Sequence, residues 1–460
     1  MSPTADITAN APRLRRDLSA FAVLMLTLSC LSPIQSIYSV GSDVLQHAGT
    51  GAALLFLLAL FPALAWALVY AEIASSFPYA GGDYVAVGTI LGPWAGFSTL
   101  TVWMVTAFPL TALAVKFNAI YLAEAFPGLP LSPTTGAVLV ASVLLALPKV
   151  RTSAFITGIF LAIEMMGVLA LIGTGLWHPA RELATVLREP LVTDAAGNLM
   201  RVPLGAMALG AVGAAYATVG GNQAIAFGEE MHEPHRTMGR VILAAAAIGG
   251  VATALPIVCV VLSARDLPTV LQSAAPFSAY FTSKVGPLAS RVMSGCVALA
   301  IFNATIAMNM FYARIAYGLG RDETLPVRAS SWLGTIDSRS GVPRNATVAV
   351  GVVSAAFCAL STHALITFGT GLTTFALGLI SCAVFAGRRR GLTGQPGHWR
   401  SPLFPFAPLM GIGLTIIFLV AALQDKDVGR PSMLLLVSCI AVTLLWYQFA
   451  LKPRGWQPRL

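Results

Sequence analysis

Long apolar segments separated by shorter polar stretches run along almost the whole chain. A helix needs about 20 apolar residues to cross a bilayer, and twelve segments come close to that length or exceed it. We therefore predict an all-α integral membrane protein with twelve transmembrane helices. The fourth and ninth segments are short, whereas the third and eighth are long enough to lie tilted. The predicted segments are residues 18–46, 51–77, 94–125, 134–148, 152–177, 204–229, 238–263, 284–319, 345–361, 363–387, 403–424 and 431–452.

The composition excludes a soluble enzyme, a disordered chain and a nucleic-acid-binding domain. Hydrophobic residues make up 57% of the 460 residues and charged residues only 10%, whereas soluble domains carry about 25% charged residues. We assign the net charge of +9 to the rim of a membrane protein, and we expect no nucleic-acid partner. Because the polar connections are short, we predict one transmembrane domain over residues 18–460, which follows an N-terminal tail at residues 1–17.

The distribution of Lys and Arg residues predicts the orientation. Arg13, Arg15 and Arg16 precede the first segment, and Arg388–Arg390 follow the tenth. Connections on the side of the N-terminus hold more than twice as many Lys and Arg residues as those on the opposite side. Cytoplasmic loops carry such an excess. We therefore expect a multi-pass protein of the cytoplasmic membrane with both termini in the cytoplasm.

Two segments contain residues that interrupt helices. The first segment contains SPIQSIYSVGS at residues 32–42, and the sixth contains ATVGGNQ at residues 217–223. Unwound backbone is tolerated inside a membrane only where it faces protein or a water-filled cavity. Interruptions five helices apart indicate a transporter built from inverted repeats, with segments one to five and six to ten as the repeats and the last two as additions. The alternative is that these glycines serve close helix packing.

A broken helix exposes amide N–H groups on one half and carbonyl groups on the other. The first attract a carboxylate and the second an ammonium group, so one site is able to hold both poles of a small-molecule zwitterion such as an amino acid. A polycation needs several carboxylates, which the central segments lack. The substrate-binding candidates from the two interruptions are Gln35, Ser36, Ile37, Tyr38, Ser39, Thr218, Val219, Gly220, Gly221 and Asn222.

Four stretches resemble the amino acid–polyamine–organocation permease family. Residues 70–84 read YAEIASSFPYAGGDY and residues 91–97 read LGPWAGF, similar to the family's Y-A-E-L-A-x-x-F-P-x-A-G-G-x-Y and L-G-P-x-x-G-F. Residues 228–236 read GEEMHEPHR and residues 313–326 read ARIAYGLGRDETLP, similar to its E-E-x-x-x-P-x-R and S-R-x-x-Y-x-x-A-R-D-G-x-L-P patterns. The matches occur in the family's order along the chain.

The resemblance implies a LeuT-type fold with a 5+5 inverted repeat, broken helices 1 and 6, and alternating-access transport of amino acids or related amines. It also implies a gating role for Tyr216, for which a packing tyrosine is the alternative. The chain departs from the family at two places. Residues 35–39 replace a Gly-Ser-Gly-like element. Gly221, followed by Asn222, stands where relatives often carry an aromatic residue.

Glu164 is the one acidic residue deep within an apolar segment. In the resemblance it takes the place of a lysine that some proton-coupled relatives carry beside the first helix. We expect Glu164 to load and release the coupling proton, with a protonated carboxyl bonded to a neighbouring helix as the alternative. Lys116 is expected to extend outward or to pair with Glu124.

Other polar residues support weaker expectations. Trp103 and Asn303 are further candidates for the substrate cavity, with packing as the alternative. Glu72, Glu230 and Arg314 lie at helix ends and are expected to make structural or inner-gate contacts.

We expect no metal and no cofactor, because the histidines lie in loops or at segment ends. The rival functions are a polyamine or organic-cation permease, an amino acid exchanger and, more distantly, a membrane-embedded enzyme, for which no catalytic motif is found. Sodium coupling remains an alternative to proton coupling.

Overall fold

A computed structural model describes residue 14 and residues 16–79, 81–194 and 197–458. Residues 1–13 and 15 of the predicted tail, with Arg13 and Arg15, lie outside the described residues. Nearly all the described structure is helical, and the exception is a small antiparallel hairpin formed by β1 (Leu191–Thr193) and β2 (Leu199–Arg201).

Within the described residues, nine helices are long and apolar enough to cross a membrane. They are α1 to α3 taken together (Ala20–Ala48), α4 (Gly51–Ser76), α6 (Pro93–Ala125), α8 (Val150–Leu176), α10 with η2 (Leu204–Glu230), α11 (Pro234–Ser263), α14 (Pro287–Arg321), α17 (Thr362–Arg389) and α19 with η3 (Tyr447–Leu451) and η4 (Gly429–Arg454 in all).

Three shorter apolar helices occupy the fourth, ninth and eleventh predicted segments. They are α7 (Leu131–Ala146), α16 (Arg344–Phe357) and α18 (Phe406–Ala422). An all-α membrane architecture is thus confirmed, whereas the count of twelve spans stays a prediction. The remaining helices are short connections: α5 (Asp83–Leu91), α9 (Leu183–Arg188), α12 (Leu267–Gln272), α13 (Pro276–Val285) and α15 (Val327–Leu333).

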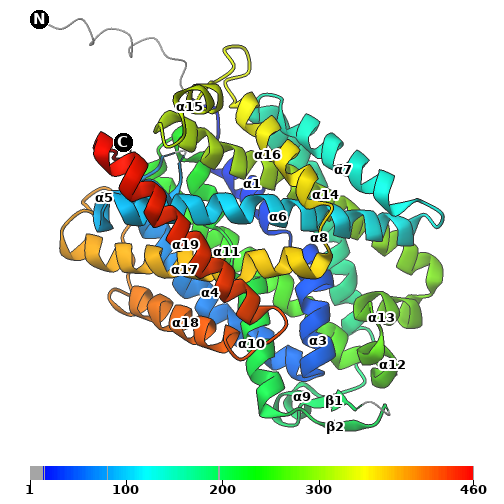
Figure 1. The fold of residues 1–460 in the computed structure, drawn as a ribbon. Coiled ribbons are helices and arrows are strands. Elements are labelled where there is room, and N and C mark those ends of the chain that lie inside the picture. The colour runs from blue at the N-terminus through cyan, green and yellow to red at the C-terminus, as the bar shows by residue number, and fades with distance from the viewer. Residues whose placement is uncertain (1–13, 15, 80, 195–196, 459–460) are drawn as a thin grey trace, which may run out of the picture.

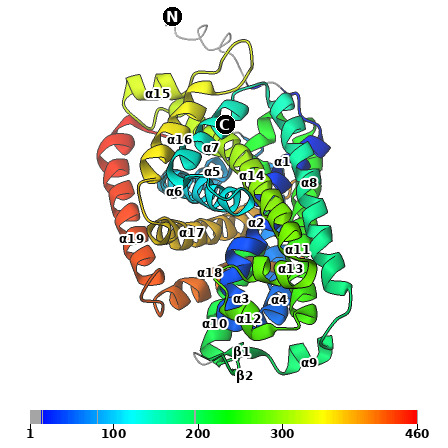
Figure 2. The same cartoon turned by 90° about the vertical axis from the view of Figure 1, so that its right-hand side faces the viewer.

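The most extensive helix contacts involve five of the long helices. Helices α4 and α11 pack along each other, and α6 packs against both α14 and α17. Figures 1 and 2 place α15 and the end of α19 at the top of the bundle and the β1–β2 hairpin with α9 at the bottom. The first described turn of the chain, at the top, is fixed to the end of η2, because the Leu18 amide donates to the Glu230 carbonyl at 2.9 Å.

The first span is interrupted where the sequence predicts, but over a shorter stretch. Helix α1 (Ala20–Leu31) ends at Ser32, whose φ of 44° and ψ of 84° are left-handed. Pro33 then opens a four-residue helix, α2 (Pro33–Ser36), because its fixed φ suits a first helical position. A π-helix, η1 (Ile37–Gly41), and α3 (Ser42–Ala48) complete the span. The backbone therefore departs from helix at one residue and continues as a widened helix.

The sixth span has the larger interruption. Helix α10 (Leu204–Thr218) stops before Val219, and the 3-10 helix η2 (Asn222–Glu230) begins after Gly221. Gly221 has a φ of +94°, which residues with a Cβ adopt at a cost. The two-glycine sequence therefore permits a turn that an ordinary residue would resist.

Candidate functional site

The two interruptions meet inside the bundle. Gly220 lies so close to the end of α1 that a Cβ built on it would come within 1.8 Å of Leu31 Cδ1. Helix α1 also packs against η2, and η1 packs against α10. The sequence-predicted residues of the two breaks are thus brought together around the junction of Leu31 and Gly220.

Glu164 lies at the first break. Its Oε1 accepts a hydrogen bond from the Ser32 hydroxyl at 2.9 Å and another from the Ile34 amide at 3.1 Å. The second carboxyl oxygen is buried and has no hydrogen-bond partner within the described residues. A carboxyl from α8 therefore satisfies an amide that the left-handed turn at Ser32 removes from the helical ladder, and one oxygen stays available to a proton.

A small cavity lies beside the second break. Its volume is about 20 Å³, and its lining includes the predicted residues Tyr216 and Val219. That volume accommodates about one water molecule, whereas ligand pockets measure roughly 300–1,000 Å³. The cavity is therefore too small to hold a ligand larger than a water molecule. The other lining residues are Trp66, Val212, Thr374, Leu377 and Phe418.

Trp66 is a cavity residue that sequence reasoning missed. Its indole N–H is buried and has no hydrogen-bond partner among the described residues. The only feature of the sequence that could have indicated this residue is that it is a single Trp within the Ala- and Leu-rich α4. A buried donor of this kind is able to bind an ordered water molecule.

Among the remaining candidates of the first break, some side chains form hydrogen bonds and others have no partner among the described residues. The Ser36 hydroxyl donates to the Leu31 carbonyl at 3.4 Å, and the Ser39 hydroxyl donates to the Gln35 carbonyl at 2.6 Å. Ile37 and Tyr38 are buried. The Tyr38 ring lies 5.5 Å from the Phe277 ring, but its hydroxyl has no partner in the described part of the chain.

The second-break candidates have structural partners as well. The Thr218 hydroxyl donates to the Ala214 carbonyl at 3.0 Å and lies 3.3 Å from the Ala59 carbonyl on α4. Asn222 is buried at the first position of η2, with 7% of its surface exposed. Thr218 thus fixes the end of α10 against α4.

Asn303 and Trp103 have different environments. Asn303 is fully buried in α14, which packs against α1 and α2, and neither atom of its amide group has a partner within the described residues. The Trp103 indole instead donates to Asp83 Oδ2 at 3.1 Å and packs on Phe311. Of the two, only Asn303 thus has side-chain hydrogen-bonding groups that are unused among the described residues.

Asp83, at the start of α5 outside the spanning helices, has a perturbed acidity. Burial raises the pKa of Asp83 to about 6, although hydrogen bonds from Tyr70 and Trp103 act in the opposite direction. Both donors reach the same carboxyl oxygen at 3.1 Å. A carboxyl that titrates near pH 6 is therefore built into the contact between α4, α5 and α6.

The predicted Lys116–Glu124 pair is wrong. The Lys116 ammonium donates to the carbonyl of Leu360, while Glu124 Oε2 accepts from Ser294 at 3.1 Å and from Ser278 at 3.5 Å. The alternative was that Lys116 extends outward, and the Leu360 carbonyl that it contacts lies in the connection between α16 and α17.

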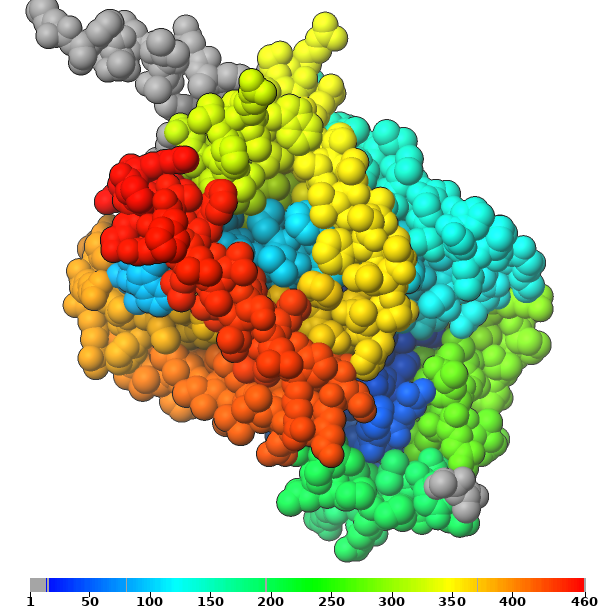
Figure 3. Space-filling view, viewed as in Figure 1, coloured from blue at the N-terminus to red at the C-terminus, as the bar shows by residue number. Residues whose placement is uncertain are grey.

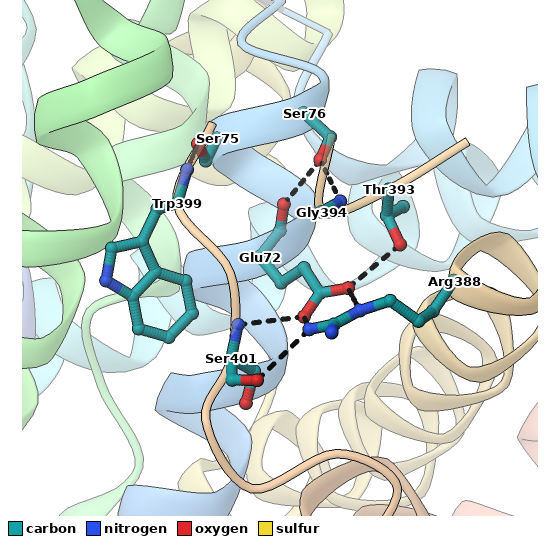
Figure 4. A network of polar contacts seen from close by, with 8 residues as sticks. All are labelled: Glu72, Ser75, Ser76, Arg388, Thr393, Gly394, Trp399 and Ser401. Carbon is teal, nitrogen blue, oxygen red and sulfur yellow. Dashed lines mark hydrogen bonds and ion pairs between the residues drawn. The ribbon is translucent and has the colours of Figure 1, made fainter. Parts of the chain in front are cut away.

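Buried ion pairs fasten helix ends to one another. Glu72, at the end of α4, binds the Arg388 guanidinium through both oxygens and also accepts from the Thr393 hydroxyl at 2.9 Å and the Ser401 amide at 3.0 Å (Figure 4). Glu230 binds Arg314 in the same two-pronged way, with 3.0 Å between Nη2 and Oε2. These are structural contacts, as expected for residues at helix ends.

The α17–α18 connection is held by the same cluster. The Trp399 amide donates to Ser75 Oγ at 2.8 Å, and the Gly394 amide donates to Ser76 Oγ at 3.4 Å (Figure 4). The connection therefore closes over the end of α4.

Comparison with known proteins agrees with this architecture. The amino acid permease family profile matches residues 18–445. The chain is 26% identical over 299 residues to the human Asc-type amino acid transporter 1, covering 62% of this chain and 55% of that protein. It is 25% identical over 420 residues to the branched-chain amino acid permease BcaP of Lactococcus lactis, covering 84% of this chain and 85% of BcaP. It is 29% identical over 209 residues to the human large neutral amino acids transporter small subunit 2, covering 43% and 38% of the two chains.

The first of these relatives is matched over only about half its length, whereas the family profile extends over nearly the whole of this chain. Spanning helices, two interruptions that meet and buried ion pairs at helix ends are consistent with that match. The chain belongs to the amino acid permease family.

Proposed function

We propose that this chain is a secondary active transporter that moves a zwitterionic amino acid across the cytoplasmic membrane by alternating access, coupled to protons. The observation that carries the proposal is the meeting of the two helix breaks at Leu31 and Gly220. Broken helices that face each other place free backbone polar groups where a substrate carboxylate and ammonium are able to bind. The names of the relatives, which are amino acid transporters, favour the same substrate class.

Recurring local structure supports the proposed 5+5 inverted repeat. Helix α5 leads through Gly92, with a φ of 109°, into Pro93 and the 33-residue α6. Helix α13 leads through Gly286, with a φ of 107°, into Pro287 and the 35-residue α14. Helices α6 and α14 are the third spans of the two proposed repeats. The same entry geometry in both halves is expected if the halves share an ancestral repeat.

Corresponding spans of the two proposed repeats also have similar lengths. The second spans, α4 and α11, have 26 and 30 residues, and each contains an internal proline, Pro62 and Pro256. The fourth spans, α7 and α16, are short, at 16 and 14 residues. The fifth, α8 and α17, have 27 and 28 residues. With α18 and α19 added, the proposal has twelve spans and both termini in the cytoplasm.

We assign the coupling proton to Glu164. One oxygen of this buried carboxyl is bound to the first break, while the other has no partner in the described part of the chain. Protonation would weaken the hydrogen bonds from Ser32 and Ile34, because a neutral carboxyl is a poorer acceptor than a carboxylate. Loading and release of the proton would thereby act directly on the α1–α2 junction beside the substrate.

The test is uptake by purified protein in liposomes. We expect an amino acid identified by thermal-shift screening to accumulate when the outside is acidic. Glu164→Gln should abolish this pH-driven accumulation while retaining exchange of labelled for unlabelled amino acid. Glu189→Gln, at an exposed position before β1, is the matched control. Full pH-driven uptake by Glu164→Gln would disprove proton coupling through this residue, and transport of amines but not amino acids would disprove the substrate class.

A further inference from the structure

An apolar groove lies on the outside of the bundle, between the start of α6 and the last turns of α19. Its volume is about 630 Å³, and its lining is Trp94, Ala441, Leu444, Leu445, Tyr447 and Gln448. Trp94 and Leu445 are exposed over 45% and 58% of their surface. The groove therefore lies on a face that meets the surrounding lipid rather than on the substrate pathway.

The groove is produced by the way the last helix ends. Regular α-helix stops at Trp446, and the chain continues as the π-helix η3 and then the short turn η4 (Lys452–Arg454). Beyond it, the Trp456 indole donates to the Asp322 carbonyl at 2.7 Å and packs edge-on against Phe97. The tail is thus fixed to the bundle end, while α19 crosses the face of the molecule in front of α6 (Figure 3).

Two cations follow the groove-lining residues along the chain. Lys452 and Arg454 are exposed, and neither forms an ion pair within the described residues. The Lys452 ammonium donates to Gln448 Oε1 at 3.3 Å, and Gln448 belongs to the groove lining. The Lys452 charge and the apolar floor are therefore parts of one surface, and Arg454 lies two residues further along η4.

We propose that this surface binds one anionic glycerophospholipid, with an acyl chain in the groove and its phosphate on Lys452 and Arg454. Trp94 and Tyr447 suit the level of the headgroups, where aromatic residues gather, and each cation near the membrane surface is attracted to acidic lipids. A second copy of the chain fits less well. A two-fold contact through α19 would bring the same unpaired cations of both copies toward each other.

The proposal is testable by native mass spectrometry of the delipidated full chain, titrated with phosphatidylglycerol and with phosphatidylcholine of the same acyl chains. We expect wild type to retain one phosphatidylglycerol at least tenfold more tightly than phosphatidylcholine. The Lys452→Gln/Arg454→Gln variant should weaken phosphatidylglycerol binding by about fivefold for each cation removed, since a cation near a membrane surface is worth about 1 kcal/mol. Arg328→Gln, which removes an exposed cation of α15 at the same end, should have no effect.

The groove itself is tested by Ala441→Phe, which places a ring in the position of the acyl chain and should weaken both lipids. Glycerophosphoglycerol, the headgroup without chains, should not compete. Equal retention of the two lipids by wild type would overturn the proposal. So would an equal loss in Arg328→Gln, competition by the free headgroup, or a lipid-free dimer joined through α19.

Discussion

Glu164 and Ser32 come from different helices of the bundle, and the Ser32 hydroxyl lies 2.9 Å from Glu164 Oε1. Ser32 is the left-handed residue at which α1 stops, so the carboxyl is bound to the point where the helix breaks. The same oxygen accepts the Ile34 amide. The residue assigned to the proton is therefore also a cap for the first break.

This dual role predicts different stabilities for two substitutions of Glu164. Glu164→Leu removes the acceptor and leaves a buried amide and hydroxyl unsatisfied, which should cost about 1–3 kcal/mol. Glu164→Gln retains a carbonyl oxygen and should lose less than half of that. Unfolding of the purified protein in one detergent measures both. Met166→Leu, at an exposed position of α8, is the control, and equal losses for Gln and Leu would contradict the capping role.

The Glu72–Arg388 pair predicts a large stability effect. Glu72 is fully buried and the Arg388 side chain is 9% exposed. Glu72→Gln leaves a nearly buried guanidinium without its counter-charge, and breaking such a pair costs about 3–5 kcal/mol. The exposed Glu189–Arg201 pair, with 58% and 78% of the side chains exposed, is the comparison, and Glu189→Gln should cost less than about 1 kcal/mol.

A double-mutant cycle separates the pair from its surroundings. Arg388→Met alone leaves the Glu72 carboxylate buried without its counter-charge. The double variant Glu72→Gln/Arg388→Met leaves no buried charge at this pair. The double variant should therefore be more stable than the sum of the single losses predicts. Additive losses in thermal unfolding would show that the two residues do not act as a pair.

The two glycines of the second break should differ in their tolerance of a methyl group. At Gly221 a Cβ would lie 2.8 Å from the Ile242 carbonyl oxygen, and the φ of +94° is unfavourable for alanine. At Gly220 the contact is with the side chain of Leu31, which is able to change rotamer. We expect Gly221→Ala to cost about 2–4 kcal/mol, from left-handed strain and backbone overlap together, and Gly220→Ala to cost less. Thermal unfolding of both variants tests the order, and the reverse order would contradict it.

Most of the helices were predictable because a spanning helix is recognised in a sequence by its length and its apolar composition. The predicted 51–77 and 204–229 correspond to Gly51–Ser76 and Leu204–Glu230. The first break was predicted from proline and serines but proved narrower, since a π-helix carries residues 37–41 without unwinding. Sequence composition does not distinguish a widened helix from an open one.

Contacts between distant residues were not predictable from one sequence. Glu72 was recognised as a helix-end residue, but its partner Arg388 lies 316 positions away. Trp103 was a candidate for the cavity, with packing as the alternative, and its bond to Asp83 on α5 was not foreseen. Trp66 lines the cavity without any motif to mark it. Helical phase indicates which residues share a face, but the neighbour of that face depends on the packing of the whole bundle.

Asp83 predicts a pH dependence of stability with a definite sign. Burial raises its pKa from 3.8 to about 6, so between these values the folded state holds the proton more tightly than the unfolded state. The stabilising contribution is complete below pH 3.8 and is lost as the pH rises through 6. Relative to Asp83→Asn, wild type should therefore lose about 2.4 kcal/mol between pH 4 and pH 7.

Unfolding curves of wild type and Asp83→Asn, measured in one detergent from pH 4 to 7, provide the test. Other titrating groups are common to both proteins and cancel in the difference. Asp337→Asn is the control. Hydrogen bonds from Ser340 lower the pKa of Asp337, so its contribution is present at high pH and is lost only as the pH falls below about 4. Its difference from wild type should stay flat from pH 4.5 to 7. A flat difference for Asp83→Asn over the same range would show that its carboxyl does not titrate there.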